Sequence, residues 1–221
     1  MATPYFQIRF DTVASTQDIA RERIEKLPIL VQAAGQSAGR GRSGSGWDNA
    51  DRALAASVAI RVSESDRRPF SLMAGVAAVR ATDGTVLKWP NDVMAGSAKV
   101  GGILVERSDE VVVVGLGMNL WWREPPDGIG ALFGEDPGPD RHAEIGGIWA
   151  AEFVRTIDGE GWPEQEYRAH CATLGQIITW EPNGSGRAIE VSEDGALIVE
   201  RSSGSHEALH SGEVSHVRSA N

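Results

Sequence analysis

Short hydrophobic runs alternate along this chain with glycine-rich and charged segments, a pattern that predicts a protein of mixed α and β structure. Runs that are apolar, or apolar at every second position, predict strands, whereas apolar positions three or four residues apart predict helices. The apolar or strand-like runs cover residues 5–10, 29–34, 53–62, 85–88, 99–106 and 110–118. The predicted helices cover residues 15–27, 68–82, 142–158 and 163–171.

The pattern changes near residue 173, where short β-like runs replace the longer elements. These runs are separated by Asn-Gly, Asp-Gly and Ser-Gly dipeptides, such as Asn183-Gly184, which are typical of tight turns between strands. We therefore predict two domains, a larger one over residues 1–172 and a small all-β one over residues 173–221.

The composition is that of an ordinary globular protein and excludes several function classes. The 221 residues carry a formal net charge of −10, which argues against broad non-specific binding of nucleic acid. Cys171 is the single cysteine, which excludes an intrachain disulfide framework and a cysteine-based zinc site. The chain shows no signal-peptide pattern and nothing near the roughly 18 consecutive apolar residues of a membrane span. We expect a soluble, cytoplasmic protein that binds neither DNA nor a membrane.

Arginine supplies almost all of the positive charge, with 18 arginines against three lysines, Lys26, Lys88 and Lys99. Lysine is a compact point charge, whereas arginine is a planar cation with several fixed donors. Lys26 falls near the expected end of a helix and needs no special role. Lys88 and Lys99 stand in unusual motifs, so we expect a chemical reason for a lysine at these positions.

Residues 35–47 are rich in glycine and serine and predict a mobile loop. Within it, the motif GRGR at residues 39–42 places two forked donors on backbone that can close around a phosphate or carboxylate. The same motif is compatible with a plain surface loop or with an arginine-glycine element that binds nucleic acid. Trp47 ends the loop and either stacks on the ring of a ligand or belongs to the core.

The motif KWPND, at residues 88–92, follows a predicted strand. Because proline cannot join a ladder of strands, we expect a rigid turn that presents Asn91 and Asp92. A lysine and a carboxylate at a strand end suit an anion together with Mg²⁺, which binds one or two carboxylates and substrate phosphates. Taken by itself, the motif is explained more simply by an ordinary turn with a surface ion pair.

Two more glycine motifs follow, KVGGILVE at residues 99–106 and GLGMN at residues 115–119. Paired glycines weaken a strand and suit a place where a ligand lies against the backbone. The second motif lacks the third glycine and the helix of a dinucleotide fingerprint, and the chain contains no Walker A pattern. Any nucleotide site in this protein is therefore of neither kind.

In their order and approximate spacing, these motifs resemble those of the biotin protein ligases. The resemblance runs from about Ser15 to Arg218 and rests on Ser15-Thr16-Gln17, Gln36, GRGR, Trp47, KWPND, KVGGILVE and GLGMN. In the tail, Thr173-Leu174-Gly175 and Gly212-Glu213-Val214-Ser215 are similar to the family's small SH3-like domain. The resemblance implies an α+β fold with two parts. One is a catalytic domain of the class II aminoacyl-tRNA synthetase-like, biotin–lipoate ligase type, with a mixed sheet flanked by helices. The other is a C-terminal SH3-like β-barrel.

Members of this family join biotin to ATP, forming biotinyl-5′-AMP and pyrophosphate, and then transfer biotin to one lysine of a carrier protein. The residues implied to be catalytic are Lys99, Arg40, Arg42 and Asp92. Those implied to bind biotin are Ser15, Thr16, Gln17, Gln36, Gly39, Arg40, Gly41, Arg42, Lys99, Gly101, Gly102, Ile103, Gly115 and Gly117. Those implied to bind ATP are Arg40, Arg42, Trp47, Lys88, Asn91, Asp92, Lys99 and Asn119.

The resemblance also implies separate roles for these residues. Lys99 would hold the biotin carboxylate and the α-phosphate oxygens, and Arg40 and Arg42 would close over the acyl-phosphate. Trp47 would stack on adenine and Asn119 would contact the edge of that base. The carboxylate of KWPND, Asp92, would hold Mg²⁺ or position the phosphates. Because an acyl-adenylate hydrolyses in water, the glycine-rich loop is expected to close once the adenylate has formed.

Only 14 residues precede Ser15, so the resemblance is to the monofunctional ligases, which lack an N-terminal DNA-binding domain. The implied partner is the biotin carboxyl carrier domain of acetyl-CoA carboxylase or a related carboxylase. A homodimer would be possible if residues 111–114 formed an exposed strand edge. Two alternatives stay open, a lipoate or octanoate ligase of the same fold and a biotin-binding protein without ligase activity.

Overall fold

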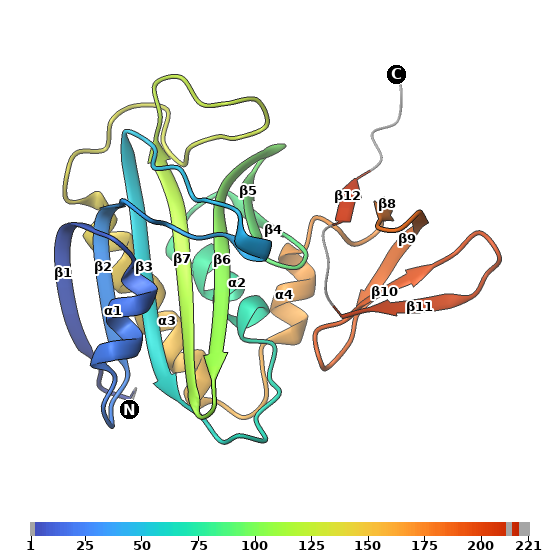
Figure 1. Cartoon of the computed structure of the whole chain (residues 1–221). Coiled ribbons are helices and arrows are strands. Elements are labelled where there is room, and N and C mark those ends of the chain that lie inside the picture. Colours follow the sequence, from blue (N-terminus) through green and yellow to red (C-terminus); the bar gives the residue numbers. More distant parts are fainter. Residues whose placement is uncertain (1–2, 211–213, 217–221) are drawn as a thin grey trace.

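The computed structural model describes residues 3–210 and 214–216, which form two β-sheets and four α-helices (Figure 1). Within these residues, the larger sheet has seven strands in the order β1-β2-β3-β7-β6-β5-β4. The strands are β1 (Phe6–Val13), β2 (Ile29–Gln36), β3 (Arg52–Arg61), β4 (Thr85–Lys88), β5 (Asp92–Ala95), β6 (Ala98–Ser108) and β7 (Val111–Trp121). β1 runs parallel to β2 and the other neighbours run antiparallel, so the sheet is mixed, as the resemblance implied.

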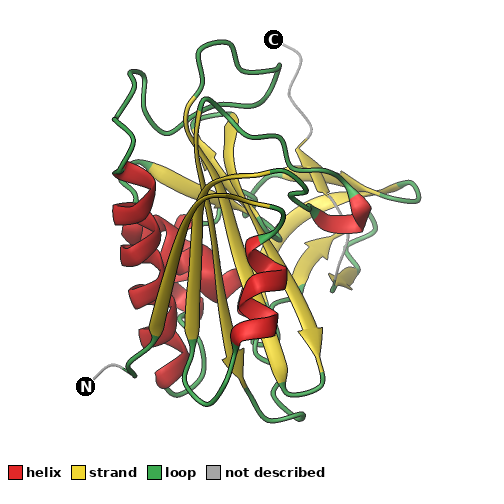
Figure 2. Ribbon diagram, turned by 60° about the vertical axis from the view of Figure 1, so that its left-hand side comes forward, coloured by secondary structure: helices red, strands yellow, loops and turns green. Residues whose placement is uncertain are grey.

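Helices cover both faces of this sheet (Figure 2). They are α1 (Thr16–Arg23), α2 (Phe70–Ala81), α3 (Arg141–Asp158) and α4 (Glu164–His170). α2 and α3 pack on one face and enclose the main hydrophobic core, in which Trp149 and Phe153 stack with ring centroids 5.8 Å apart. The short helix α1 packs on the other face, against β2, β3 and β7.

The two faces of the sheet differ in the size of their side chains. On β3, Leu54, Val58 and Ile60 belong to the core beneath α2 and α3. Successive side chains of a strand point to opposite faces, and the intervening positions of β3 carry small residues such as Ala55 and Ser57. The α1 face therefore has room for a cavity above the strands.

The C-terminal part of the chain forms a second, antiparallel sheet in the order β11-β10-β9-β8-β12. Its strands are β8 (Ile177–Trp180), β9 (Gly184–Val191), β10 (Leu197–Glu200), β11 (His206–Leu209) and β12 (Val214–His216). This agrees with the all-β texture predicted beyond residue 173. Gly212, Glu213 and Arg218, which contributed to the resemblance, lie outside the described residues.

Trp89 of the KWPND segment (residues 88–92) joins the two sheets. Its side chain is 2% exposed, its backbone N–H donates to Thr173 Oγ1 at 3.0 Å, and its indole N–H donates to the Gly195 carbonyl at 3.0 Å. Both acceptors belong to the C-terminal part. The KWPND segment belongs to the larger predicted domain and is thus held by hydrogen bonds to the C-terminal one.

α1 ends at Arg23, not at residue 27 as the sequence pattern predicted. Ile24 is already extended, with ψ at 124°, and its N–H closes the last turn on the Ala20 carbonyl at 3.1 Å. Pro28 follows closely and disfavours helical backbone in the residue before it. The chain therefore leaves the helix early and enters β2.

β5 was not predicted, because the KWPND segment was expected to be only a turn. In the structure Asp92 begins β5 and pairs with Lys88 on β4 and with Gly102 on β6. Pro90 precedes the strand, so its missing N–H removes no ladder hydrogen bond. Asp92 is consequently held by a strand on each side.

β7 lies between β3 and β6, so Val111–Val114 is not an exposed edge and cannot pair with a second copy. A homodimer through another surface stays a prediction. No helix in the described part of the chain is long and apolar enough to cross a membrane.

Candidate active site

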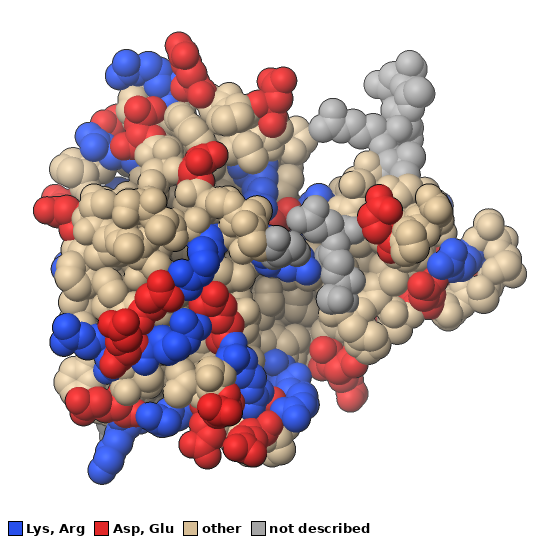
Figure 3. Space-filling view, in the orientation of Figure 1, with Lys and Arg blue, Asp and Glu red and all other residues tan. Residues whose placement is uncertain are grey.

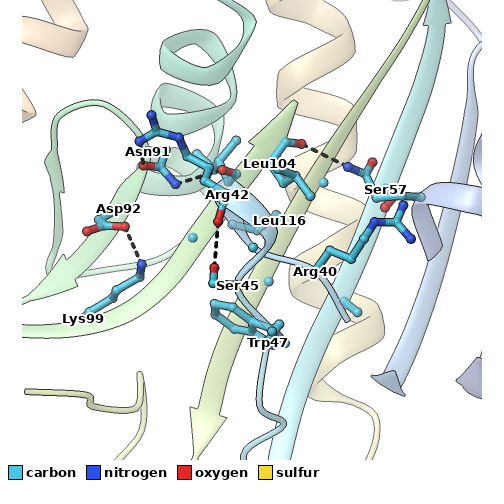
Figure 4. A pocket seen from close by; sticks show the side chains of 18 of the residues that line it. Arg40, Arg42, Ser45, Trp47, Ser57, Asn91, Asp92, Lys99, Leu104 and Leu116 are labelled. Carbon is cyan, nitrogen blue, oxygen red and sulfur yellow. Dashed lines mark hydrogen bonds and ion pairs between the residues drawn. The ribbon is translucent and has the colours of Figure 1, made fainter. Parts of the chain in front are cut away.

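A cavity of about 270 Å³ opens on the α1 side of the large sheet, where the predicted motifs meet. β3, β6 and β7 form its floor, and the start of α1 forms one end. The KWPND segment and Lys99 form the other end. Because β2 includes residues 35 and 36, the glycine-rich loop comprises residues 37–47, and it crosses in front of the floor (Figure 4).

Two rows of mostly small residues make the floor of the cavity. Across β3, β7 and β6, the first row is Ala55, Gly117 and Gly102, and the second is Ser57, Gly115 and Leu104. A methyl group on Gly117 would lie 2.9 Å from the Trp47 ring, so this close approach requires glycine. The floor therefore accepts a flat ring directly against the backbone.

The end of the cavity at α1 carries neutral hydrogen-bonding groups. Ser15 caps the helix, its hydroxyl accepting from the Asp18 N–H at 3.4 Å. The hydroxyls of Thr16 and Ser57 lie 2.7 Å apart, and the Thr16 N–H donates to Gln36 Oε1 at 2.8 Å. This end can therefore donate to and accept from a polar, uncharged group.

Gln17 adds an unsatisfied acceptor to the same end. Its Nε2 donates to the Leu104 carbonyl at 3.3 Å, but its Oε1 is buried and meets no donor among the described residues. A buried oxygen without a partner is costly, so such atoms nearly always have one. A ligand N–H placed beside Gln17 would supply it.

The opposite end of the cavity is charged. Lys99 Nζ lies 2.5 Å from Asp92 Oδ1, and Lys88 Nζ lies 4.0 Å from Asp92 Oδ2. β6 carries a bulge at Val100, beside Lys99, and a bulge redirects neighbouring side chains. Two ammonium groups against one carboxylate leave this end with a net positive charge, which suits phosphate or carboxylate oxygens.

Asn91 connects this charged end to the glycine-rich loop. Its Oδ1 accepts from Arg42 Nη1 at 3.0 Å, and its Nδ2 donates to the Ile103 carbonyl at 3.0 Å. The Arg42 guanidinium is thereby held near the charged end of the cavity (Figure 4).

The glycine-rich loop is paired with itself. The Trp47 N–H donates to the Gly39 carbonyl at 3.0 Å, and the Gly41 N–H donates to the Ser45 carbonyl at 2.7 Å. A short 3₁₀ turn, Arg42–Gly44, closes the tip. The sequence predicted a loop without regular structure, and this turn was not foreseen because glycine and serine have weak local preferences for it.

Arg40 contacts carboxylates on α1 and β6. Its Nη1 and Nη2 donate to the two Asp18 oxygens at 2.9 and 2.7 Å, and Nη2 also lies 3.2 Å from Glu106 Oε2. The hydrogen bond from Arg40 lowers the pKa of Asp18. Burial raises the pKa of Glu106, but hydrogen bonds from Arg21 and Arg40 outweigh it and leave that pKa below its usual value. Figure 3 shows the acidic and basic side chains interleaved on this side of the molecule.

The structure brings most of the predicted site residues to this cavity. Those that line it are Ser15, Thr16, Gln17, Gln36, Arg40, Gly41, Arg42, Trp47, Lys88, Asn91, Asp92, Lys99, Gly102, Ile103, Gly115 and Gly117. Their binding and catalytic roles stay predictions at this point.

Gly39, Gly101 and Asn119 do not line the cavity. Gly101 pairs with Met118 on the core side of the sheet, where a methyl group would lie 3.3 Å from Val93. Asn119 is buried and donates through Nδ2 to the Gly130 carbonyl at 3.0 Å. For these residues the structure supplies a packing or backbone-bracing role, and their ligand roles remain predictions.

Sequence reasoning did not assign several lining residues. They are Ser45, Gly46, Ala55, Ala56, Ser57, Trp89, Pro90, Leu104, Leu116, Val214 and Ser215. Ser57 had a usable signal, since it is a single hydroxyl inside an apolar strand. Val214 and Ser215 had none, because only the packing of β12 beside β8 brings this distant segment to the cavity.

Comparison with known proteins finds two family matches, which include most of the residues that line the cavity. Residues 10–119 match the Biotin/lipoate A/B protein ligase family, and residues 173–217 match the Biotin protein ligase C terminal domain. The biotin--[acetyl-CoA-carboxylase] ligase of Mycobacterium tuberculosis is 31% identical over 212 residues, which cover 86% of this chain and 79% of that protein. The chain belongs to the biotin protein ligase family. A family member from Paracoccus denitrificans, also named biotin--[acetyl-CoA-carboxylase] ligase, is 27% identical, covering 85% of this chain and 92% of its own.

Solved structures of biotin protein ligases share this fold. The biotin protein ligase of Aquifex aeolicus in complex with biotin and ATP superposes with a TM-score of 0.81 at 25% identity. The match covers 97% of this chain and 99% of that one. It therefore extends through both sheets of the biotin protein ligase fold.

Proposed function

We propose that this chain is an ATP-dependent ligase that activates biotin as biotinyl-5′-AMP and transfers it to a lysine of a carrier protein. The observation that carries this conclusion is the two-ended cavity, with neutral hydrogen-bonding groups at one end and a cationic cluster at the other. Biotin has the matching form, because a neutral ureido ring is joined through an apolar chain to a carboxylate. The relatives named above act in the same reaction class, and the Aquifex protein binds biotin and ATP.

The neutral end is the proposed site of the ureido ring. Thr16, Ser57 and Gln36 form a continuous set of hydrogen bonds there, and the buried Oε1 of Gln17 lacks a donor. An N–H of the ureido ring would satisfy that oxygen. A lipoyl dithiolane ring has no N–H to offer, so this end favours biotin over lipoate.

In the first step, a carboxylate oxygen of biotin attacks the α-phosphorus of ATP, and pyrophosphate leaves. Two anions must approach one another, so cations placed where charge develops lower the barrier. We assign Lys99 and Arg42 to the carboxylate and α-phosphate oxygens. Asp92 orients the Lys99 ammonium across 2.5 Å.

Mg²⁺ fits the charged end only together with the substrate phosphates. The described residues contain no group of three or more His, Cys, Asp or Glu side chains that would enclose a metal ion. Mg²⁺ commonly binds through one or two carboxylates and substrate phosphates, and Asp92 is the carboxylate we assign to it. When bound, the ion would neutralise charge on the phosphate oxygens.

In the second step, the amine of the carrier lysine attacks the acyl carbonyl of biotinyl-5′-AMP, an amide bond forms, and AMP leaves. The proposed partner is the biotin carboxyl carrier domain of acetyl-CoA carboxylase or a related carboxylase, as the names of the relatives suggest. We propose that residues 1–172 form the catalytic domain and residues 173–221 the C-terminal domain, which the two family matches support. We place the reaction in the cytosol, because a chain whose single cysteine, Cys171, is buried and free does not rely on disulfides.

The deciding experiment is mass spectrometry of the protein incubated with Mg-ATP and biotin, with lipoate in a parallel reaction. Biotinyl-AMP in the first reaction alone is the expected result. Adenylate with lipoate alone would show that the substrate is wrong and the reaction class right. Folded protein that binds biotin and forms no adenylate would instead be a binding protein.

A further inference from the structure

The two arginines of the glycine-rich loop point to different ends of the cavity, and the ligase reaction by itself does not explain why (Figure 4). Arg42 reaches Asn91 beside the charged end, whereas Arg40 lies on Asp18 and Glu106. We propose that Arg40 is the anchor of this loop and not a phosphate ligand, and that Asp18 and Glu106 are positioning residues that hold the loop over bound biotin and adenylate. The kinetic part of this inference rests on the proposed ligase function.

The geometry of the contact supports an anchor. Arg40 uses two nitrogens against both oxygens of Asp18, at 2.9 and 2.7 Å, and one of them also lies 3.2 Å from Glu106. Two-pronged arginine–carboxylate contacts are directional and stronger than single ones. Arg21 extends the cluster, 2.8 Å from Glu106 and 3.5 Å from Asp18. Networks of this kind stabilise more than isolated surface pairs do.

The loop needs such an anchor because its tip has little packing of its own. A methyl group added at Gly44 or Gly46 would meet no atom within 4 Å. Ordering a glycine-rich segment costs more conformational entropy than ordering other residues. The ion pairs of Arg40 supply contacts that the tip lacks.

The anchor points lie on the elements that also line the cavity. Asp18 follows Gln17, whose side chain is at the neutral end, and Glu106 lies two positions after Leu104 of the floor. Arg40 is two positions before Arg42 along the loop. Fixing Arg40 to α1 and β6 therefore also limits where Arg42 can reach. Loss of the anchor should release bound ligand faster, and by a larger factor than it slows adenylate formation.

The first test is hydrogen exchange of the ligand-free protein, which does not depend on any activity. In the double variant Asp18→Asn/Glu106→Gln, the paired amides of Gly41 and Trp47 should exchange about tenfold faster than in the unchanged protein. Arg21→Gln is the matched control, since it removes a charge from the cluster and leaves Arg40 paired. Unchanged exchange in the double variant, or equal acceleration in the control, would overturn the anchor.

The second test is a mutant cycle that measures how fast biotinyl-AMP leaves the protein. We expect Arg40→Gln and Asp18→Asn/Glu106→Gln each to speed the release of biotinyl-AMP about tenfold. The combined variant should release it no faster, because all three variants remove the same interaction. Multiplying effects would show that Arg40 contacts the adenylate directly and would overturn the proposal. Melting temperatures within a few degrees of the unchanged protein check that the variants fold. If the unchanged protein forms no adenylate, the ligase proposal fails and the exchange experiment still decides the anchor.

Discussion

The glycine-rich loop and the KWPND segment border the same cavity but are held in opposite ways. The KWPND segment is part of the core: Trp89 is buried, the Pro90 carbonyl accepts from the Ser71 hydroxyl at 3.1 Å, and the Asn91 carbonyl accepts from the Ile103 N–H at 2.9 Å. The loop is held by its own short hydrogen bonds and by partly exposed ion pairs. One wall of the cavity is therefore rigid, and the other can open at modest cost.

This difference suits an enzyme that must both place charges accurately and admit large substrates. Electrostatic stabilisation works best with groups that are oriented before the reaction begins, which is what the buried wall supplies for Asp92 and Lys99. Retention of a reactive intermediate needs a part that opens and closes, which is what the loop supplies. Variants of the rigid wall should therefore affect chemistry and folding. Variants of the loop should affect retention, and a variant at Arg42 should slow adenylate formation as well, because we assign Arg42 to the reacting oxygens.

The largest effect is expected at the rigid wall, from Lys99→Gln. Removing the ammonium takes away a cation from the point where two anions meet, so the rate of adenylate formation should fall by about 10²- to 10³-fold. Single-turnover measurement of biotinyl-AMP formation checks this. Lys26→Gln removes a lysine that does not line the cavity and should leave the rate within about twofold. A similar loss in both variants would show that net charge, not position, matters.

Trp89→Phe tests the same wall through stability. The shorter ring leaves a void and deprives the Gly195 carbonyl of its donor, so the free energy of unfolding should fall by about 2 kcal/mol. Urea denaturation measures this. Trp162→Phe is the matched control, because its indole N–H donates to the Glu193 carbonyl at 2.7 Å at a more exposed place. Equal losses in the two variants would contradict the view that the KWPND segment is the more rigidly held.

Arg42→Gly tests the movable wall. Loss of the contact with Asn91 should let biotinyl-AMP escape about tenfold faster, because a hydrogen bond from a charged donor is lost. Escaped adenylate would acylate lysines of bystander proteins, which a biotin blot detects. Arg67→Gly, in another exposed loop, controls for the loss of one charge. No rise in bystander labelling would show that Arg42 does not retain the adenylate.

The smallest effect is expected from His216 of β12, whose pKa is lowered by burial and then by the nearby charge of Lys88. The folded state binds the proton less readily than the unfolded one, so stability is full above the ordinary value of 6.5 and falls as the pH drops below it. The loss should stay under about 1 kcal/mol and should vanish in His216→Gln. Urea denaturation at several pH values measures it, and an undiminished loss in His216→Gln would show that another group is responsible.

Much of the fold could be predicted because local signals agreed with the tertiary structure. The helix predicted from residue 15 is α1, which Ser15 caps, and the apolar run 53–62 corresponds to the interior strand β3. β5 was missed because it is only four residues long and closely follows Pro90. So short a segment has too weak a pattern to distinguish a strand from a turn. The end of α1 was misplaced because apolar spacing continues past Arg23, where the chain has already turned toward β2.

The site was predictable where a residue's own chemistry is unusual, and not where only its neighbours make it useful. Lys99 and Asp92 stood out from the sequence, and the structure places them 2.5 Å apart. The two adjacent glycines of KVGGILVE could not be told apart, because the strand's alternation decides which faces the cavity. Gly102 faces it, and Gly101 faces the core. Val214 lines the cavity only because the two sheets pack together, and no local sequence pattern predicts that packing.

The contact of the Trp47 ring with the floor of the cavity has a consequence for sequence variation. Added carbons at Gly117 and Gly102 would lie 2.9 and 3.5 Å from this ring. Alanine at 117 would therefore be accepted only where position 47 holds a smaller side chain, and the wide indole demands glycine in return. Among related sequences, residues at positions 47 and 117 should therefore change together, whereas a methyl group at 102 would meet the ring only at an ordinary van der Waals distance.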